Sequence, residues 1–195
     1  LIIQLGAIYV SLCSGKLLHV KRCEEEGFSM APSGYLALGC IGLDGLLNFY
    51  EGSEAVCDRE MERAFVEHTG WNSRLATPYF VRCSDYLAEL FAPDTVEGMT
   101  ASAPGFYAPQ GRYLRLAPAD RRLNEKIESF EYRGHRFTNF EMEGSALAGL
   151  SRLMGHDAVT ICTVIAQRVA LESDTDYRPF VDKMIATCLE KLAGI

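Results

Sequence analysis

The chain has 195 residues, of which 48% are hydrophobic and 23% charged, and its 26 acidic residues outnumber 19 Lys and Arg to give a formal net charge of −7. This composition is that of an ordinary globular protein, and it excludes a disordered or fibrous one. The acidic balance argues against a nucleic-acid partner, because contact with the phosphate backbone requires a basic face. We therefore expect a single soluble domain over 1–195 with a hydrophobic core of its own.

No apolar run reaches the roughly 18 residues of a membrane span, so no membrane partner is expected. The opening LIIQLGAIYVSLC is apolar, but it has no basic stretch ahead of it and no clear cleavage site, so we do not interpret it as a secretory signal. The seven cysteines are never spaced as Cys-x-x-Cys, which favours reduced thiols in a cytoplasmic protein. The four histidines form no motif with them, so neither a metal site nor a catalytic thiol is expected.

Apolar runs separated by turn residues predict alternating strands and helices in the first half of the chain. The predicted elements are, in chain order, strands at 1–12 and 34–42, a helix from 53 to about 68, a strand at 78–82 and a helix at 84–91. Ser53 is expected to cap the first of these helices, and Gly70 is expected to end it.

The second half of the chain continues this alternation, which predicts an α/β fold. The predicted elements are a strand at 96–103, a loop, a helix from 118 to about 130, a helix at 142–154, a strand at 158–166 and a helix at about 178–193. The run AVTICTVIA at 158–166 is typical of a central strand covered by helices on both faces. One face of the last helix is expected to be buried through Phe180, Val181, Met184, Ile185, Cys188, Leu189 and Leu192.

A first polar cluster lies in the loop after the strand predicted at 96–103, at the kind of strand end where open α/β sheets bind ligands. Within this loop Phe106 offers an aromatic ring, Gln110 an amide and Arg112 a guanidinium. Such a set can stack on a flat heterocycle and hydrogen-bond its edge. On spacing alone, an ordinary loop with a packed phenylalanine and an exposed arginine is the simpler interpretation.

A second polar cluster, NFEMEG at 139–144, places two carboxylates at the start of a helix of small residues. In extended backbone Glu141 and Glu143 project to one side with Met142 opposite, unless the helix start breaks the alternation. Carboxylates accept two hydroxyl hydrogen bonds well, so a vicinal diol such as that of ribose is a natural ligand. The alternative is that both acids simply favour a helix N-terminus through the helix dipole.

A third candidate is Arg168, which directly follows the apolar run at 158–166. An arginine at such a strand end either forms a surface ion pair or serves a site. The acidic segment after it, with Glu172, Asp174 and Asp176, is compatible with a lid.

Three stretches of the chain, IGLDGLLNFYEG, TASAPGFYAPQGR and NFEMEGSALAGLSRLMGHDAVTICTVIAQR, follow one another in this order. Over 37–195 they resemble the uridine phosphorylases of the nucleoside phosphorylase superfamily, in particular the bacterial branch with a GLDNLLNFY-like segment. The resemblance implies a three-layer fold with a central mixed, mainly parallel sheet flanked by helices. It also implies a cytoplasmic pentosyltransferase of pyrimidine salvage that converts uridine and phosphate to uracil and ribose 1-phosphate, as a dimer or hexamer and without a cofactor.

The resemblance also implies a role for each polar cluster. Phe106 would stack on uracil, while Gln110 and Arg112 would bond its polar edge and stabilise the negative charge that develops on the base. Met142 would pack against the ribose, and Glu143, with Glu141 beside it, would accept its hydroxyls. Arg168 would lie near the base as a second catalytic arginine, with the segment after it closing over the site.

The phosphate half of the site departs from the resemblance. Gln4 and Ala7 stand where the family has an arginine and a threonine that bind phosphate, and 8–36 is a divergent segment. The N-terminal part of the family fold, with its glycine-containing phosphate loop, is expected to be missing. This leaves two alternatives to a phosphorylase: a catalytically impaired nucleoside-binding or assembly subunit, and a nucleosidase that uses water.

Overall fold

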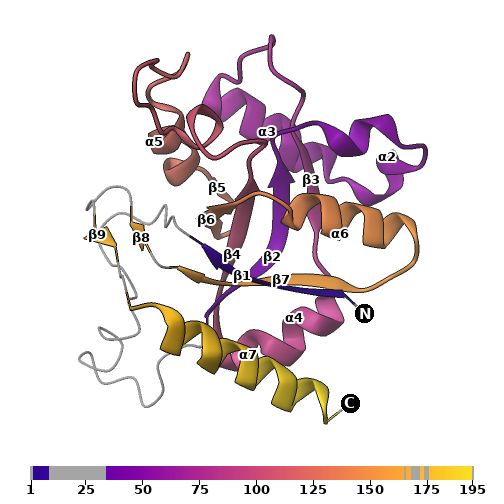
Figure 1. Cartoon of the computed structure of the whole chain (residues 1–195). Coiled ribbons are helices and arrows are strands. Elements are labelled where there is room, and N and C mark those ends of the chain that lie inside the picture. The colour runs from indigo at the N-terminus through magenta and orange to yellow at the C-terminus, as the bar shows by residue number, and fades with distance from the viewer. Residues whose placement is uncertain (1, 9–33, 165, 168–171, 174–175, 195) are drawn as a thin grey trace.

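The computed structural model describes residues 2–8, 34–164, 166–167, 172–173 and 176–194, and within them the chain builds a seven-stranded sheet and a separate two-stranded hairpin (Figure 1). The strands are β1 (Ile2–Ile8), β2 (Gly34–Gly42), β3 (Tyr79–Arg82), β4 (Thr95–Ser102), β5 (Glu131–Tyr132), β6 (His135–Glu141), β7 (Ala158–Val164), β8 (Ala166–Gln167) and β9 (Glu172–Ser173). The helices are α2 (Ser53–Val56), α3 (Arg59–Thr69), α4 (Asp85–Phe91), α5 (Leu123–Ser129), α6 (Gly144–Leu153) and α7 (Arg178–Leu192). Short 3-10 turns are η1 (Leu46–Phe49), η2 (Ala92–Asp94) and η3 (Ala108–Gln110).

The sheet is mixed, with the strand order β1-β7-β2-β4-β6-β5 and with β3 paired to β2 off this path. Its longer pairings, β1 with β7, β2 with β4 and β4 with β6, are parallel. One edge of β2 changes partner along its length, because Tyr35 and Leu36 pair with β7 whereas 39–42 pair with β3. The register against β4 shifts between Ala37 and Gly39, so β2 bulges at the point where its partner changes.

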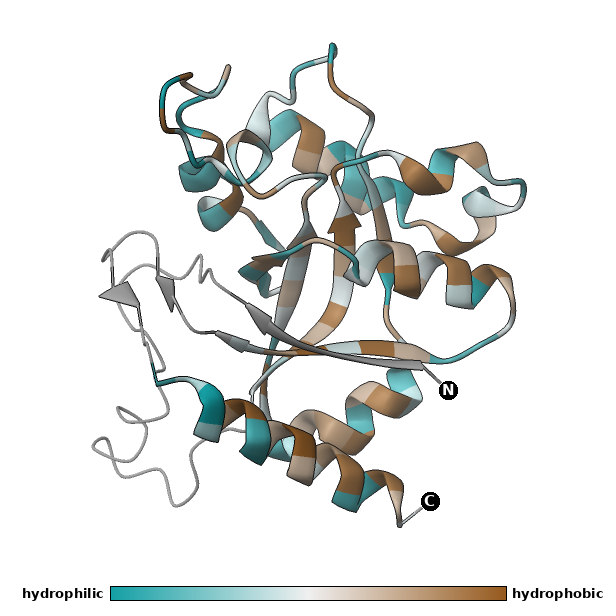
Figure 2. Cartoon of the chain, in the orientation of Figure 1, coloured by the Kyte–Doolittle hydropathy of each residue, from teal (hydrophilic) through white to brown (hydrophobic). Residues whose placement is uncertain are grey.

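Two hydrophobic cores lie on the two faces of the sheet, because successive residues of a strand point to opposite sides. Cys40 and Tyr79 enter the core that α4, α6 and α7 cover, while their neighbours Ile41 and Phe80 enter the core that α3 and α5 cover. The covering helices carry both hydrophobic and hydrophilic segments along their lengths (Figure 2). The predicted α/β class, with helices flanking a mixed sheet, is confirmed.

Three predicted elements in the first half of the chain are confirmed. They are the strand 34–42, which is β2, the strand 78–82, which is β3, and the helix 84–91, which is α4. The strand predicted at 1–12 is found over Ile2–Ile8, and 9–12 lie outside the described residues. The single helix predicted from 53 is wrong, because α2 ends at Val56 and α3 begins at Arg59.

The break between α2 and α3 has a clear physical cause in the neighbouring strand. Cys57 forms a bridge with Val81, and the Asp58 amide donates to the Phe80 carbonyl at 2.9 Å, so both residues are drawn out of helical geometry. The Asp58 carboxylate then accepts from the Met61 amide at 3.0 Å and caps α3. Ser53 is therefore not the cap of this helix, whereas Gly70 ends it in the left-handed conformation as predicted.

In the second half, β4, β7 and α7 lie close to their predicted positions, but three details differ. Helix α5 begins only at Leu123, and Leu189 of α7 is 61% exposed instead of buried. Strand β6 was not predicted at all. Its buried part contains Thr138, Asn139 and Glu141, so it lacks the alternation of apolar and polar residues that identifies a strand in sequence.

Among the described residues, no helix combines the length and apolar character that crossing a membrane demands.

The cap of α3 gives a stability prediction. Asp58→Ala should lower the free energy of unfolding by about 1 kcal/mol, because the Met61 amide loses its acceptor. The matched control is Asp85→Ala, which removes an exposed ion pair with Arg82 and should cost no more than about 0.5 kcal/mol. Urea unfolding of both variants measures the difference, and equal losses would contradict the capping role of Asp58.

Candidate functional site

The candidate site lies at one end of the sheet, where β4 and β6 run out side by side. The two strands are parallel, and Ser102 at the end of β4 lies opposite Glu141 at the end of β6. One residue further, the Ala103 amide donates to the Glu141 carbonyl at 2.9 Å. The loop 103–112 and the start of α6 therefore leave the sheet from the same edge.

The loop 103–112 brings together the three side chains of the first polar cluster. The Arg112 guanidinium lies over the Phe106 ring, 3.6 Å from its centroid. Its Nη1 donates to the Phe106 carbonyl at 2.7 Å and to Gln110 Oε1 at 2.6 Å. The Phe106 side chain is 42% exposed while Gln110 is buried, so the loop is not the ordinary one with a packed phenylalanine and an exposed arginine.

Two residues outside this trio fix the shape of the loop. Gly111 has a φ of 70°, and a side chain there would meet the Asn124 amide group at about 2.5 Å. Asn124 Nδ2 in turn donates to the Gln110 carbonyl at 3.3 Å, which ties the loop to α5. The loop conformation therefore depends on the glycine between Gln110 and Arg112 and on a contact with α5.

The chemistry that the loop presents is mainly that of donors. An arginine side chain can only donate, and burial lowers the pKa of Arg112 without making it an acceptor. Gln110 Oε1 accepts from Arg112, and the amide nitrogen of the same side chain is a donor. Donors beside an aromatic ring suit a flat ligand whose edge carries carbonyl oxygens.

Glu141 lies at the base of the second cluster and is only 7% exposed. One carboxylate oxygen, Oε1, accepts from the Ser102 hydroxyl, and the other, Oε2, accepts from the backbone amides of Glu143 and Gly144. Both oxygens are therefore engaged within the protein. The extended backbone that would carry Glu141 and Glu143 to one side ends here, because the chain turns into α6.

Glu143 differs from Glu141 in being exposed, as Met142 is. It is the N-cap residue of α6, and its side chain makes no capping hydrogen bond. Burial and the negative charge of Glu141 both raise the pKa of Glu143, while a hydrogen bond from the Met142 backbone acts in the opposite direction. Glu143 is thus an exposed carboxyl group whose pKa lies above its ordinary value.

The third cluster is only partly visible. Arg168 and Asp174 lie outside the described residues, whereas β8 and β9 on either side of Arg168 form an antiparallel hairpin. Gln4 and Ala7 lie on β1, in register with Thr160 and Thr163 of β7.

Within the described residues, no group of three or more His, Cys, Asp or Glu side chains could hold a metal ion, and the five described cysteines are free thiols.

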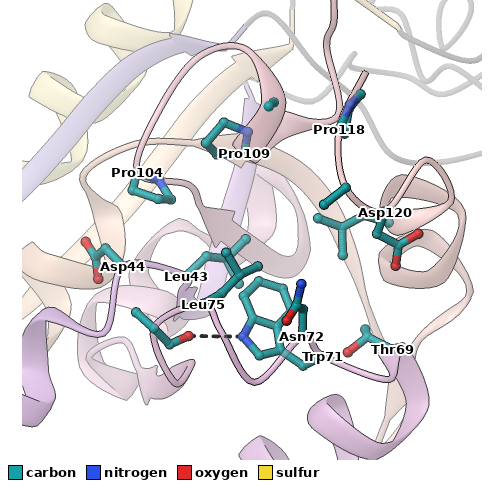
Figure 3. A pocket seen from close by; sticks show the side chains of 14 residues that line it. Leu43, Asp44, Thr69, Trp71, Asn72, Leu75, Pro104, Pro109, Pro118 and Asp120 are labelled. Carbon is teal, nitrogen blue, oxygen red and sulfur yellow. Dashed lines mark hydrogen bonds between the residues drawn. The ribbon is translucent and has the colours of Figure 1, made fainter. Parts of the chain in front are cut away.

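Beside the loop 103–112 lies an apolar pocket of about 360 Å³ that the sequence did not predict (Figure 3). Pro104 and Pro109 form its loop side, while Leu43, Trp71 and Leu75 face them. The indole Nε1 of Trp71 donates to the Ala76 carbonyl at 3.0 Å, which holds the ring in the wall. The loop thus borders an apolar cavity.

Comparison with known proteins connects this geometry to a family. Residues 42–195 match the family model described as the phosphorylase superfamily. A curated uridine phosphorylase from Thermococcus kodakarensis is 40% identical over an alignment of 81 residues, which covers 38% of this chain and 26% of that protein.

Among solved structures, a Trypanosoma brucei nucleoside phosphorylase described as showing uridine phosphorylase activity has a TM-score of 0.76 at 22% identity, with 99% of this chain and 63% of that chain covered. Isoform 2 of uridine phosphorylase from Schistosoma mansoni, in complex with citrate, has a TM-score of 0.56 at 18% identity, covering 99% of this chain and 61% of that one. These structures share the fold of this chain, and the chain spans less than two thirds of their length.

The environment of Glu143 gives a titration prediction. Its pKa should lie above the ordinary glutamate value of about 4.3, and Glu141→Gln should lower it, because that substitution removes the neighbouring negative charge. Carbon-detected NMR of the labelled carboxyl group, followed through an acid titration, measures both values. A pKa for Glu143 at or below the ordinary value in the unaltered protein would contradict the described surroundings.

Proposed function

The chain belongs to the phosphorylase superfamily, and we propose that within it the protein is a pentosyltransferase that converts uridine and phosphate to uracil and ribose 1-phosphate. The single observation that carries this proposal is the placement of a donor-lined loop and an exposed carboxylate at one edge of the sheet. The hydrogen bond from the Ala103 amide to the Glu141 carbonyl joins the two segments. One segment suits a carbonyl-bearing base and the other a vicinal diol, and a pyrimidine nucleoside carries both groups.

In the proposed complex the base lies against the loop 103–112. Phe106 stacks on the uracil ring, and Gln110 and Arg112 donate to its carbonyl edge. The contact between the Arg112 guanidinium and the Phe106 ring supports this arrangement, since it holds ring and donors next to each other. Guanidinium and amide donors favour uracil over cytosine at the position where cytosine carries an amino group.

The ribose lies against Met142 and Glu143. The Glu143 carboxylate accepts from the two hydroxyls of the diol, and Met142 packs against the sugar. Glu141 is not a ribose ligand in this proposal, because its two oxygens already accept from Ser102, Glu143 and Gly144.

The proposed reaction needs stabilisation of the negative charge that develops on the base. A phosphate oxygen bonds to the anomeric carbon as the bond from that carbon to the base nitrogen breaks, and the electron pair of the broken bond goes to the base. Gln110 and Arg112 then donate to a uracil anion, which later takes up a proton from water. Loss of one donor of this kind costs about 3 to 4 kcal/mol of transition-state stabilisation in well-studied enzymes.

Inorganic phosphate is the proposed co-substrate, and no cofactor is required. We assign the second catalytic arginine to Arg168 on the basis of the resemblance. Gln4 and Ala7, in place of an arginine and a threonine, are the reason to keep an impaired nucleoside-binding subunit as the second candidate.

We further propose that the protein self-associates in the cytoplasm. Three large apolar side chains near the site, Phe49, Leu114 and Leu116, are between 82% and 86% exposed. Exposed apolar residues of this size at one end of a molecule favour contact with another protein surface, and a second copy is the occupant that the family resemblance implies.

The first test is a spectrophotometric assay for uracil release from uridine by the full-length protein, with and without phosphate. Release that depends on phosphate is the expected result. Equal release without phosphate would identify a nucleosidase instead, and uridine binding without release would identify the impaired binding subunit.

The second test compares two variants by calorimetry. Arg112→Ala should reduce the preference for uridine over cytidine by about tenfold, because a charged donor to the base is lost. Glu143→Ala should weaken uridine and cytidine alike and leave free uracil unchanged, because uracil has no diol.

Arg115→Ala, an exposed arginine close to the same loop, is the matched control and should change neither property. An equal effect of Glu143→Ala on uridine and on free uracil would contradict the ribose role. An unchanged ratio of uridine to cytidine affinity in Arg112→Ala would contradict the base role.

A further inference from the structure

The first turn of a helix leaves backbone amides without partners inside the helix, and α6 meets this requirement in an unusual way. Its N-cap residue, Glu143, contributes no side-chain hydrogen bond. Instead the acceptors come from two strand ends. Glu141 accepts from the amides of Glu143 and Gly144, and the Ser102 hydroxyl oxygen accepts from the Ser145 amide at 2.8 Å.

The two acceptors are themselves connected and buried. The Ser102 hydroxyl donates to Glu141 Oε1 while its oxygen accepts from Ser145, so one hydroxyl links the carboxylate to the helix. The Ser145 hydroxyl shares a hydrogen bond of 3.0 Å with the hydroxyl of Tyr79. Tyr79, Ser102 and Ser145 are each at most 1% exposed, so water is not available as a substitute partner.

Two glycines leave room for this arrangement. A side chain at Gly42 would lie within 2.2 Å of the Tyr79 ring, and one at Gly144 would lie 3.1 Å from the Glu141 carboxyl group. Neither glycine has a positive φ, so close packing and not backbone geometry is what requires the small residue. The ends of β2, β3, β4 and β6 therefore all contribute to the start of α6.

We infer that Glu141 is a positioning residue and that a buried hydrogen-bond chain from Tyr79 through Ser145 and Ser102 to Glu141 holds the Met142–Glu143 turn in the orientation that binds the ribose. The inference rests on the ribose role proposed for Glu143. Glu141 holds the backbone of the turn through its amides, and the Ser102 hydroxyl holds the Glu141 carboxylate. Tyr79 holds Ser145, the helix residue whose amide donates to Ser102.

A positioning role for this chain predicts different effects on uridine affinity and on free uracil affinity, which a purely structural role would not. Free uracil contacts the loop 103–112, whereas uridine also needs Glu143 in place. A variant that disturbs the chain should therefore weaken uridine and leave uracil unchanged. Loss of general stability would affect both ligands or neither.

The test uses Ser102→Ala and Tyr79→Phe in the full-length protein, with calorimetry for uridine and for uracil and with amide hydrogen exchange at 143–145 measured by NMR. For Ser102→Ala we expect about tenfold weaker uridine binding, uracil affinity within about twofold of the unaltered protein, and at least about tenfold faster exchange at 143–145. Tyr79→Phe keeps the ring and should show smaller changes in the same direction.

The matched control is Ser151→Ala, which removes a buried hydroxyl near the other end of α6 and should change neither uridine affinity nor exchange at 143–145. Exchange at 143–145 that is unchanged in both test variants would overturn the positioning chain, as would equal weakening of uridine and uracil. Failure of the unaltered protein to bind uridine at all would instead refute the proposed function, so the two failures are distinguishable. If Ser102→Ala does not fold, Tyr79→Phe decides the outcome by the same measurements.

Discussion

The hydrogen bond from the Ser102 hydroxyl to the buried Glu141 carboxylate joins two parallel strands at the point from which every described candidate ligand residue departs. From Ser102 the chain continues into the loop that carries the aromatic ring and the donors. From Glu141 it continues into the turn that carries Met142 and Glu143. Since both segments start from one strand pairing, the separation between the proposed base contacts and the proposed ribose contacts is set by the sheet and not by either loop.

Burying a carboxylate is costly unless hydrogen bonds replace the water that it loses. Glu141 meets this condition with one hydroxyl and two backbone amides. Its negative charge also acts on its neighbour, because it raises the pKa of Glu143. One acid thus gives the site its geometry and the other its exposed acceptor, although the two are nearly adjacent in sequence and identical in chemistry.

The sequence predicted those parts of the fold that depend on local pattern. The glycine-bounded apolar run of β2 and the β-branched run of β7 were found, and the residue types of the loop 103–112 indicated its chemistry. What was missed depends on contacts between distant segments. The break before α3 is caused by hydrogen bonding of Cys57 and Asp58 with β3, and β6 is hidden because Thr138 and Asn139 are polar but buried. Glu141 is buried and hydrogen-bonded whereas Glu143 is exposed, and this difference likewise depends on Ser102, a residue about forty positions before Glu141.

The loop 103–112 carries the candidate ligand residues Phe106, Gln110 and Arg112, and its Pro104 and Pro109 also line the apolar pocket of Figure 3. Hydrogen bonds within the loop help to keep its shape beside this pocket. Arg112 makes two of them, to the Phe106 carbonyl and to Gln110. The same guanidinium therefore holds the loop and, in the proposed complex, donates to the base. Lysine carries a single point charge and has no planar fork with which to bond the loop and the proposed ligand together. Replacing Arg112 with lysine would therefore alter the shape of the loop as well as its proposed contacts to the base, although the charge is preserved.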